Sequence, residues 1–178
     1  MKVVLEEVIR KESLIEVAKR MMLAARTAPK AKGVDNLVVS YAEGAAIQMI
    51  ADKMKEMVRQ GISPEFYIRD ANNILASEVL FLIGTRISPI GVKQCGLCGF
   101  ENCEEKSRYP TVPCSFNTGD LGIAIGSAVS TAADSRVDNR IMMSVGKAVK
   151  ALRLLGDEVA IVYGIPLSCS GKSPFFDR

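Results

Sequence analysis

Four cysteines lie within a short stretch of the chain, and a fifth, Cys169, stands alone near its end. The clustered four are Cys95, Cys98, Cys103 and Cys114, with two, four and ten residues between them. Thiolates are the soft ligands that iron–sulfur clusters prefer, and four of them complete a [4Fe–4S] cube. Three ligands on one tight loop would bind one side of a cube, and the more distant Cys114 would close the other. The spacing therefore predicts a [4Fe–4S] cluster.

Two other interpretations of the four cysteines stay open. A structural zinc site of four cysteines more often shows two Cys-x2-Cys pairs, and only the first gap here has that length. Disulfides or idle thiols are the other interpretation, although closely spaced cysteines in the cytosol favour a metal or cluster. We interpret Cys169 as an isolated packed or surface thiol rather than a spare redox group.

The composition excludes several classes of function. The chain has no histidine, which removes imidazole metal sites and histidine-dependent catalysis. Dispersed charges with a net of +3, and no tryptophan, argue against a nucleic-acid partner. No apolar run approaches the roughly 20 residues that cross a bilayer, and residues 1–14 lack the apolar core of a signal peptide. We therefore expect a cytoplasmic protein with no membrane partner.

Helical and strand patterns alternate along the chain. Apolar spacing and end signals predict helices at residues 13–28, 44–60, 70–76, 120–133 and 144–154. The first of these helices is expected to begin at a capping box, Ser13 to Glu16. Apolar runs predict strands at residues 37–41, 66–69, 79–84 and 159–163. The third of these runs is uninterrupted, as in a central strand covered on both faces.

The segment 85–118 breaks this alternation. It has no hydrophobic period, it is rich in proline and glycine, and it contains all four clustered cysteines. Long irregular segments are usually functional or disordered, and the cysteines favour a function. We expect a single domain over residues 1–178, a mixed sheet layered with helices, with 85–118 as an inserted iron–sulfur loop.

Two resemblances to known families cover much of the chain. The motif at 95–103 resembles the small [4Fe–4S] domain of electron-transport and corrinoid-linked proteins of anaerobes. Residues 24–39, 119–133 and 152–166 resemble the opening, the central helix and the last helix-to-strand passage of the nitroreductase family. The whole is similar to an uncharacterised ferredoxin-domain family of anaerobic bacteria and archaea. This resemblance implies an α+β fold, a nitroreductase-like mixed sheet layered with helices, carrying the inserted cysteine loop.

The resemblance also implies an intertwined homodimer with FMN at the dimer interface. The residues that match or flank the flavin-binding positions are Lys30, Lys32, Asn139, Arg140 and Lys172, with Arg178 also in the tail. The family's Pro-Ser-x-x-Asn motif is replaced here by Pro-Lys-Ala-Lys-Gly, and its Arg-Arg-Ser-x-Arg phosphate segment is absent. Solvated loop lysines are therefore an equal interpretation of Lys30 and Lys32. The stripe Gly122-x3-Gly126 is expected to form a dimer seam, a flavin-facing wall or a helix contact within the chain.

The function expected from these features is a [4Fe–4S] redox protein of anaerobic metabolism. It would transfer electrons from a ferredoxin-like donor or act as a flavin-linked oxidoreductase, in which the cofactor carries the chemistry. The alternative is a non-enzymatic module, either a cluster-based sensor or a structural zinc protein. No side chain in the sequence is assigned as catalytic.

Overall fold

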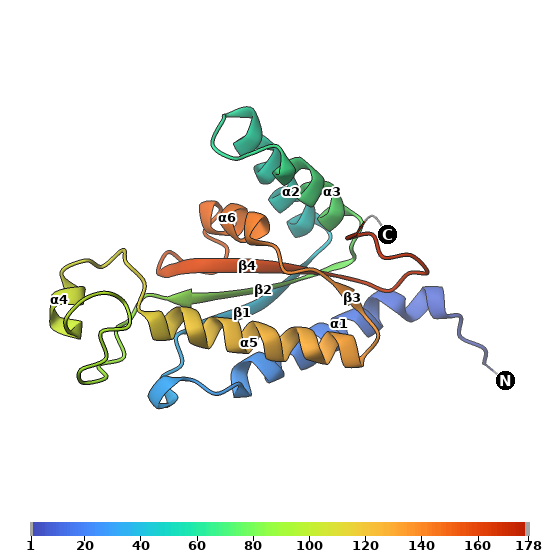
Figure 1. Cartoon of the computed structure of the whole chain (residues 1–178). Helices are drawn as coiled ribbons and strands as arrows, with labels where there is room; N and C mark the ends of the chain where they lie inside the picture. The colour runs from blue at the N-terminus through green and yellow to red at the C-terminus, as the bar shows by residue number, and fades with distance from the viewer. Residues whose placement is uncertain (1, 177–178) are drawn as a thin grey trace.

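The computed structural model describes residues 2–176 and contains a four-stranded sheet between two layers of helices (Figure 1). The elements in chain order are α1 (Glu6–Thr27), the 3-10 turn η1 (Ala31–Gly33), β1 (Leu37–Glu43), α2 (Ala45–Arg59), α3 (Phe66–Leu75), β2 (Val79–Arg86), α4 (Cys103–Ser107), α5 (Ser115–Asp134), β3 (Asp138–Asn139), α6 (Met143–Ala151) and β4 (Val159–Ser168). None of the helices in the described residues is long and apolar enough to cross a membrane.

The strands follow the order β1-β2-β4-β3, and every pairing is antiparallel. The sheet was expected to be mixed, so its antiparallel pairing throughout is a difference from the sequence prediction. Strand β2 lies between β1 and β4, as its uninterrupted apolar run predicts. Strand β3 is only two residues long and pairs with the end of β4.

A hydrophobic core lies on each face of the sheet. Side chains of a strand alternate between the two faces, so a strand covered on both sides must be apolar throughout. On β2, Phe81 and Ile83 pack with α1 and α5, whereas Leu80 and Leu82 pack with α2, α3 and α6. Helices α1 and α5 lie side by side on their face, where they contact each other extensively (Figure 1).

Two of the local predictions are wrong. Helix α1 begins at Glu6, and the Ser13 hydroxyl donates to the carbonyl of Ile9 inside the helix instead of capping a new one. Residues 66–69, predicted as a strand, form the first turn of α3. Their aromatic residues favour strands in isolation, but Tyr67 and Ile74 are at helical spacing and both are buried in the core.

Two of the predicted elements are also longer than expected. Helix α5 begins at Ser115 rather than at 120, and β4 extends to Ser168 rather than ending at 163. Residues 87–114 lie beyond the end of the sheet, at the opposite end of the molecule from the two termini (Figure 1). This segment, which we call the cysteine loop, contains only the short helix α4.

Candidate functional site: a pocket of four thiols

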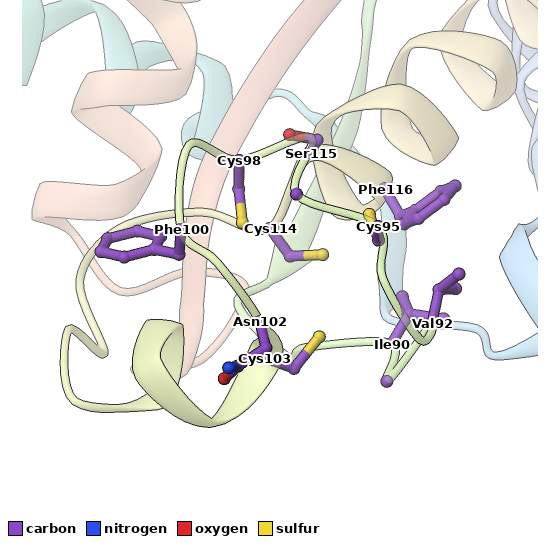
Figure 2. Close-up of a pocket in the computed structure, with 12 residues that line it drawn as sticks. Ile90, Val92, Cys95, Cys98, Phe100, Asn102, Cys103, Cys114, Ser115 and Phe116 are labelled. Atoms are coloured by element: carbon purple, nitrogen blue, oxygen red, sulfur yellow. The ribbon is translucent and has the colours of Figure 1, made fainter.

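The side chains of Cys95, Cys98, Cys103 and Cys114 line one pocket between the cysteine loop and the start of α5. Figure 2 shows their four sulfur atoms around a common space. Cys114 is buried and the other three are half-buried, and none of them forms a disulfide. The exposed Cys169 lines a different pocket.

A glycine turn places the first two cysteines. Gly96 and Gly99 have φ angles of +59° and +85°, which side chains with a Cβ adopt only with strain. The N–H of Gly99 donates to the carbonyl of Gly96 at 3.0 Å and closes the turn. Cys95 precedes the turn and Cys98 lies within it, so the glycines allow both thiols to face the same space.

Helix α4 places the third cysteine. Asn102 is its N-cap, and its side-chain oxygen accepts the N–H of Glu105 at 2.9 Å. The Glu105 carboxylate in turn accepts the N–H of Glu101 at 2.8 Å. This reciprocal capping stabilises a five-residue helix that would not form alone. Cys103 is the first residue of that helix and lines the pocket.

The fourth cysteine is the N-cap of the central helix α5. Its carbonyl accepts the N–H groups of Asn117 and Thr118 at 2.9 and 3.3 Å. Asn117 also accepts the N–H of Ser88 at 2.8 Å, which ties the start of the cysteine loop to α5. The N-terminus of a long helix has unpaired N–H groups and a partial positive charge, so Cys114 lies where a negatively charged group is stabilised.

The chemistry of the pocket fits an iron–sulfur cluster. Its candidate ligands are all sulfur, and its walls are formed largely by Ile90, Val92, Phe100 and Phe116. Near it, Asn117 is 1% exposed, and its side-chain N–H₂ has no acceptor within residues 2–176. Soft thiolates, an apolar shell and spare N–H donors are the surroundings in which clusters are held and tuned. No three Cys, Asp or Glu side chains of the described residues are close enough to hold a single metal ion.

The residues proposed for FMN have other roles or lie apart. The Lys30 side chain is 5% exposed, and its ammonium donates to the carbonyls of Ala25, Arg26 and Ala28 at 3.1, 2.7 and 2.8 Å. It therefore neutralises the negative C-terminal end of α1. Because the three N–H donors of the ammonium are already used by these carbonyls, Lys30 is not placed to bind a phosphate. Nothing in the sequence distinguished this capping lysine from a loop lysine.

Asp35 anchors the same loop. The Arg26 guanidinium donates to its carboxylate at 2.6 Å, and the Lys30 ammonium lies 3.8 Å away. Burial raises the pKa of Asp35, but the hydrogen bonds from Arg26 and from the Leu37 N–H, with the charges of Arg26 and Lys30, lower the pKa overall. The carboxylate is therefore ionised at neutral pH, and the loop is held by charges of the chain itself.

The other four residues are divided between the two ends of α5. Lys32 is exposed and donates to the carbonyl of Ile90 at 3.5 Å, next to the thiol pocket. Asn139, Arg140 and the exposed Lys172 follow the far end of α5 in the chain or lie in the tail beyond β4. Between Asp120 and Asp134 the helix is about 20 Å long, so one chain does not bring the five residues together.

At that far end, two of the candidate side chains have partners within the chain. The Asn139 amide donates to the carbonyl of Val137 at 3.3 Å. The Arg140 guanidinium donates to the carbonyl of Phe175 at 2.8 Å and lies 5.1 Å from the centre of the Phe176 ring. Arg140 therefore holds the C-terminal segment next to β3, whereas Asn139 bonds only to the turn that precedes its own strand. Arg178 lies outside the described residues.

Comparison with known sequences places the chain in a family. A protein of Archaeoglobus fulgidus, named "Uncharacterized protein", is 39% identical over 180 residues, covering 97% of this chain and 96% of the relative. Residues 111–178 match the model of a family described as "Uncharacterized protein containing a ferredoxin domain (DUF2148)". The chain belongs to this ferredoxin-domain family. Of the four pocket cysteines, only Cys114 lies within the matched residues.

Solved structures similar to the ferredoxin-domain protein include nitroreductases and a BluB-like flavoprotein. A mutant of the FMN and NADPH-dependent nitroreductase NfnB of Sphigopyxis sp. strain HMH has a TM-score of 0.63 at 11% identity, covering 90% of this chain and 81% of that one. A nitroreductase with bound FMN from Desulfitobacterium hafniense DCB-2 has a TM-score of 0.60 at 13% identity, covering 88% and 78%. A BluB-like flavoprotein of Clostridium difficile 630 has a TM-score of 0.54 at 19% identity, covering 88% and 84%. The fold is nitroreductase-like, as the sequence predicted.

A buried carboxylate attaches the loop after α1 to the central helix of the ferredoxin-domain protein. Both oxygens of Asp120 accept the N–H of Ala31, at 3.1 and 3.2 Å. Replacing Asp120 by alanine leaves that N–H unpaired, so we expect a loss of about 1–3 kcal/mol in the free energy of unfolding. Urea denaturation measures this loss. Asp134→Ala, at the exposed end of the same helix, is the control and should change stability by less than about 0.5 kcal/mol. Equal losses of stability in Asp120→Ala and Asp134→Ala would contradict the role of Asp120 in anchoring the loop.

Proposed function

We propose that this protein binds one [4Fe–4S] cluster through Cys95, Cys98, Cys103 and Cys114 and uses it to transfer single electrons. The observation that supports the proposal most directly is that all four thiols line one apolar pocket. The ferredoxin-domain family and the nitroreductase-like fold are both consistent with a redox role. Bound there, the cluster would supply the one-electron chemistry, and the chain would supply the ligands, the N–H donors and the surroundings.

The position of the pocket suits electron exchange with another protein. The cysteine loop is at one end of the molecule (Figure 1), and three of the four thiols are only half-buried. Leu97, between the first two cysteines, is largely exposed, as is Tyr109 after α4. A ferredoxin-like donor would therefore reach the cluster from solvent without a rearrangement of the sandwich. We propose such a protein as the electron donor.

A homodimer is the second part of the proposal. Gly122 and Gly126 of α5 are exposed, so they do not pack against another helix of the same chain, and Ile123 between them is 49% exposed. Such a smooth apolar stripe suits close approach of a second copy. We expect light scattering to give about twice the chain mass of 19.3 kDa. Ile123→Lys should give a single-chain mass, because a dimer seam would bury its charge. A wild-type monomer would contradict the dimer.

Flavin binding depends on that dimer. The five residues suggested for FMN lie in two groups about 20 Å apart along α5, and Lys30 is already engaged within its own chain. A flavin site would therefore need the second copy to bring one group near the other. The solved nitroreductase with bound FMN supports testing for the flavin, although one chain provides no phosphate cradle from these residues.

Anaerobic purification followed by iron, sulfide, zinc and flavin analysis tests the proposal. We expect about four iron and four sulfide per chain, with broad visible absorbance that dithionite bleaches. A colourless protein with one zinc per chain would contradict the cluster and support the structural zinc module. A cluster without flavin would favour electron transfer or sensing. Flavin that accepts electrons from the cluster would favour the oxidoreductase.

A further inference from the structure

A side-chain amide is buried at the start of α5 with its N–H₂ group unpaired. Asn117 is 1% exposed, and within residues 2–176 its buried Nδ2 atom has no hydrogen-bond partner. Its Oδ1 atom accepts the N–H of Ser88 at 2.8 Å, which fixes the oxygen and the nitrogen of the amide in their places. A buried donor without an acceptor costs free energy, because it has given up its bonds to water. The fold therefore holds N–H donors for an acceptor that the described residues do not supply.

The position of Asn117 in the helix places this amide at the thiol pocket. Asn117 is the third residue of α5, and Cys114 is the N-cap. Side chains of a helix lean toward its N-terminus, so Asn117 lies over the turn that begins at Cys114, three residues earlier on the same face. Cys114, Ser115 and Phe116 all line the thiol pocket. The unpaired N–H₂ group therefore lies at the pocket wall that carries the fourth thiol.

The hydrogen bond to Ser88 holds the amide against the same wall. Ser88 is at the start of the cysteine loop, and Ile90, two residues later, lines the pocket. The backbone N–H of Asn117 also donates to the Cys114 carbonyl at 2.9 Å. The residue is thus fixed between two segments that both line the pocket. Cys114 is 5% exposed, so a hydrogen bond on this side of the pocket is little weakened by water.

We propose that the Asn117 amide donates a hydrogen bond to a sulfur atom on the Cys114 side of the bound cluster and raises the reduction potential of the cluster. The inference rests on the proposed function, since it needs the cluster in the pocket. Reduction adds one negative charge to the cluster, and hydrogen bonds to its sulfur atoms are among the factors that set the potential. An N–H donor stabilises the more negative, reduced form more strongly than the oxidised form. Asn117 thus tunes the cluster without ligating it.

The test is an anaerobic redox titration of two variants, in which one electron passes from a dithionite-reduced mediator to the cluster and no covalent bond changes. Asn117→Asp keeps an oxygen that accepts the Ser88 N–H but replaces the N–H₂ group. Asn117→Leu removes the N–H₂ group without adding a charge. Loss of the N–H donors is what the two variants share, so the midpoint potential should fall in both. We expect the reduced-to-oxidised ratio at a fixed potential to decrease about tenfold, or about 59 mV for one electron.

Asn102→Asp is the matched control. Asn102 also lines the pocket, but it is exposed and its amide points away from the four sulfur atoms (Figure 2). Aspartate caps a helix as well as asparagine does, so α4 should stay in place. The potential should shift several times less than in Asn117→Asp, because water and salt screen the exposed carboxylate. An equal shift in Asn102→Asp, or an unchanged potential in Asn117→Leu, would overturn the inference.

Electron–nuclear double resonance of the reduced cluster gives a readout that a purely structural role would not move. Protein with the heavier stable isotope of nitrogen in its asparagine side chains should show a nitrogen coupling to the cluster in the wild type and in Asn102→Asp. Asn117→Leu should lack this coupling. A wild type without the coupling would overturn the inference.

Loss of the cluster also has a defined meaning. If one Asn117 variant binds no cluster, the potential of the other decides. If both bind none, the amide holds the loop instead of tuning the cluster, and the inference is overturned. The two proposals fail differently. A wild type without iron and sulfide overturns the function and the inference together, whereas a wild-type cluster whose potential does not depend on Asn117 overturns the inference alone.

Discussion

Replacing Cys98 by alanine is expected to remove nearly all of the iron from the anaerobically purified protein. Cys98 is one of the four thiols of the pocket, and alanine has no atom that coordinates iron. Three remaining thiolates hold a cube much less tightly than four. We expect a decrease of roughly tenfold or more in bound iron, or at least about 1.4 kcal/mol in binding free energy. Iron and sulfide analysis with the visible spectrum measures the change.

The cysteine loop should also lose its order in this variant. Binding of a cluster couples to folding of the segment that holds it, since the ligands converge only in the folded state. Lys93 and Arg108 are exposed in this loop, so limited trypsin digestion should cut there faster in Cys98→Ala than in the wild type. The sandwich has two cores of its own and should remain resistant.

Cys169→Ala is the matched control for the loss of a thiol. Cys169 is exposed and lies outside the pocket, so its removal should leave iron content and trypsin sensitivity unchanged. A Cys98→Ala protein with full iron and an unchanged spectrum would show that this cysteine is not a ligand. Equal iron loss in Cys98→Ala and Cys169→Ala would contradict the assignment of the ligands to the four cysteines of the pocket.

Replacing Gly146 by alanine is expected to destabilise the whole sandwich. Gly146 lies in α6 where the helix crosses β4, and a Cβ there would be 1.7 Å from the carbonyl oxygen of Val162 and 2.9 Å from the nitrogen of Tyr163. These are backbone atoms of a paired strand, so no change of rotamer relieves the clash. Met142 and Gly164 exchange two hydrogen bonds, of 2.9 and 3.1 Å, which hold the start of α6 on the strand.

The expected cost of Gly146→Ala is roughly 3 kcal/mol in the free energy of unfolding, as for a severely overpacked core. For a chain of this length the melting temperature should fall by roughly 6–12 °C. Circular dichroism on samples of matched iron content measures it. Gly119→Ala is the control, because Gly119 lies in α5 with no atom within 4 Å of the added Cβ. That control should gain up to about 1 kcal/mol from its helix propensity. A Gly146→Ala protein as stable as the wild type would contradict the close packing of α6 on β4.

Some features of the fold and site followed from local sequence because their cause is local. A chain without histidine and with four clustered cysteines offers only sulfur as a soft ligand, whatever its fold. The uninterrupted apolar run of β2 predicts a strand covered on both faces, and β2 is the inner strand between β1 and β4. Ala28 and Pro29 end α1 because proline cannot continue a helix.

Other features were decided by contacts between distant segments. The strand-like residues at 66–69 form a helix because Tyr67 gains more from burial in the core than its backbone preference costs. Cys114 reaches the other three thiols because α5 begins beside the cysteine loop, and Lys30 is occupied because the end of α1 presents carbonyls to it. In α4, a five-residue run with three charges has no apolar period, so only packing could bury Lys106 and leave Glu104 exposed. The sequence by itself therefore determined that the candidate ligands are thiols. The tertiary structure decided which side chains are buried and which charged groups have partners, because both depend on neighbours that are remote along the chain.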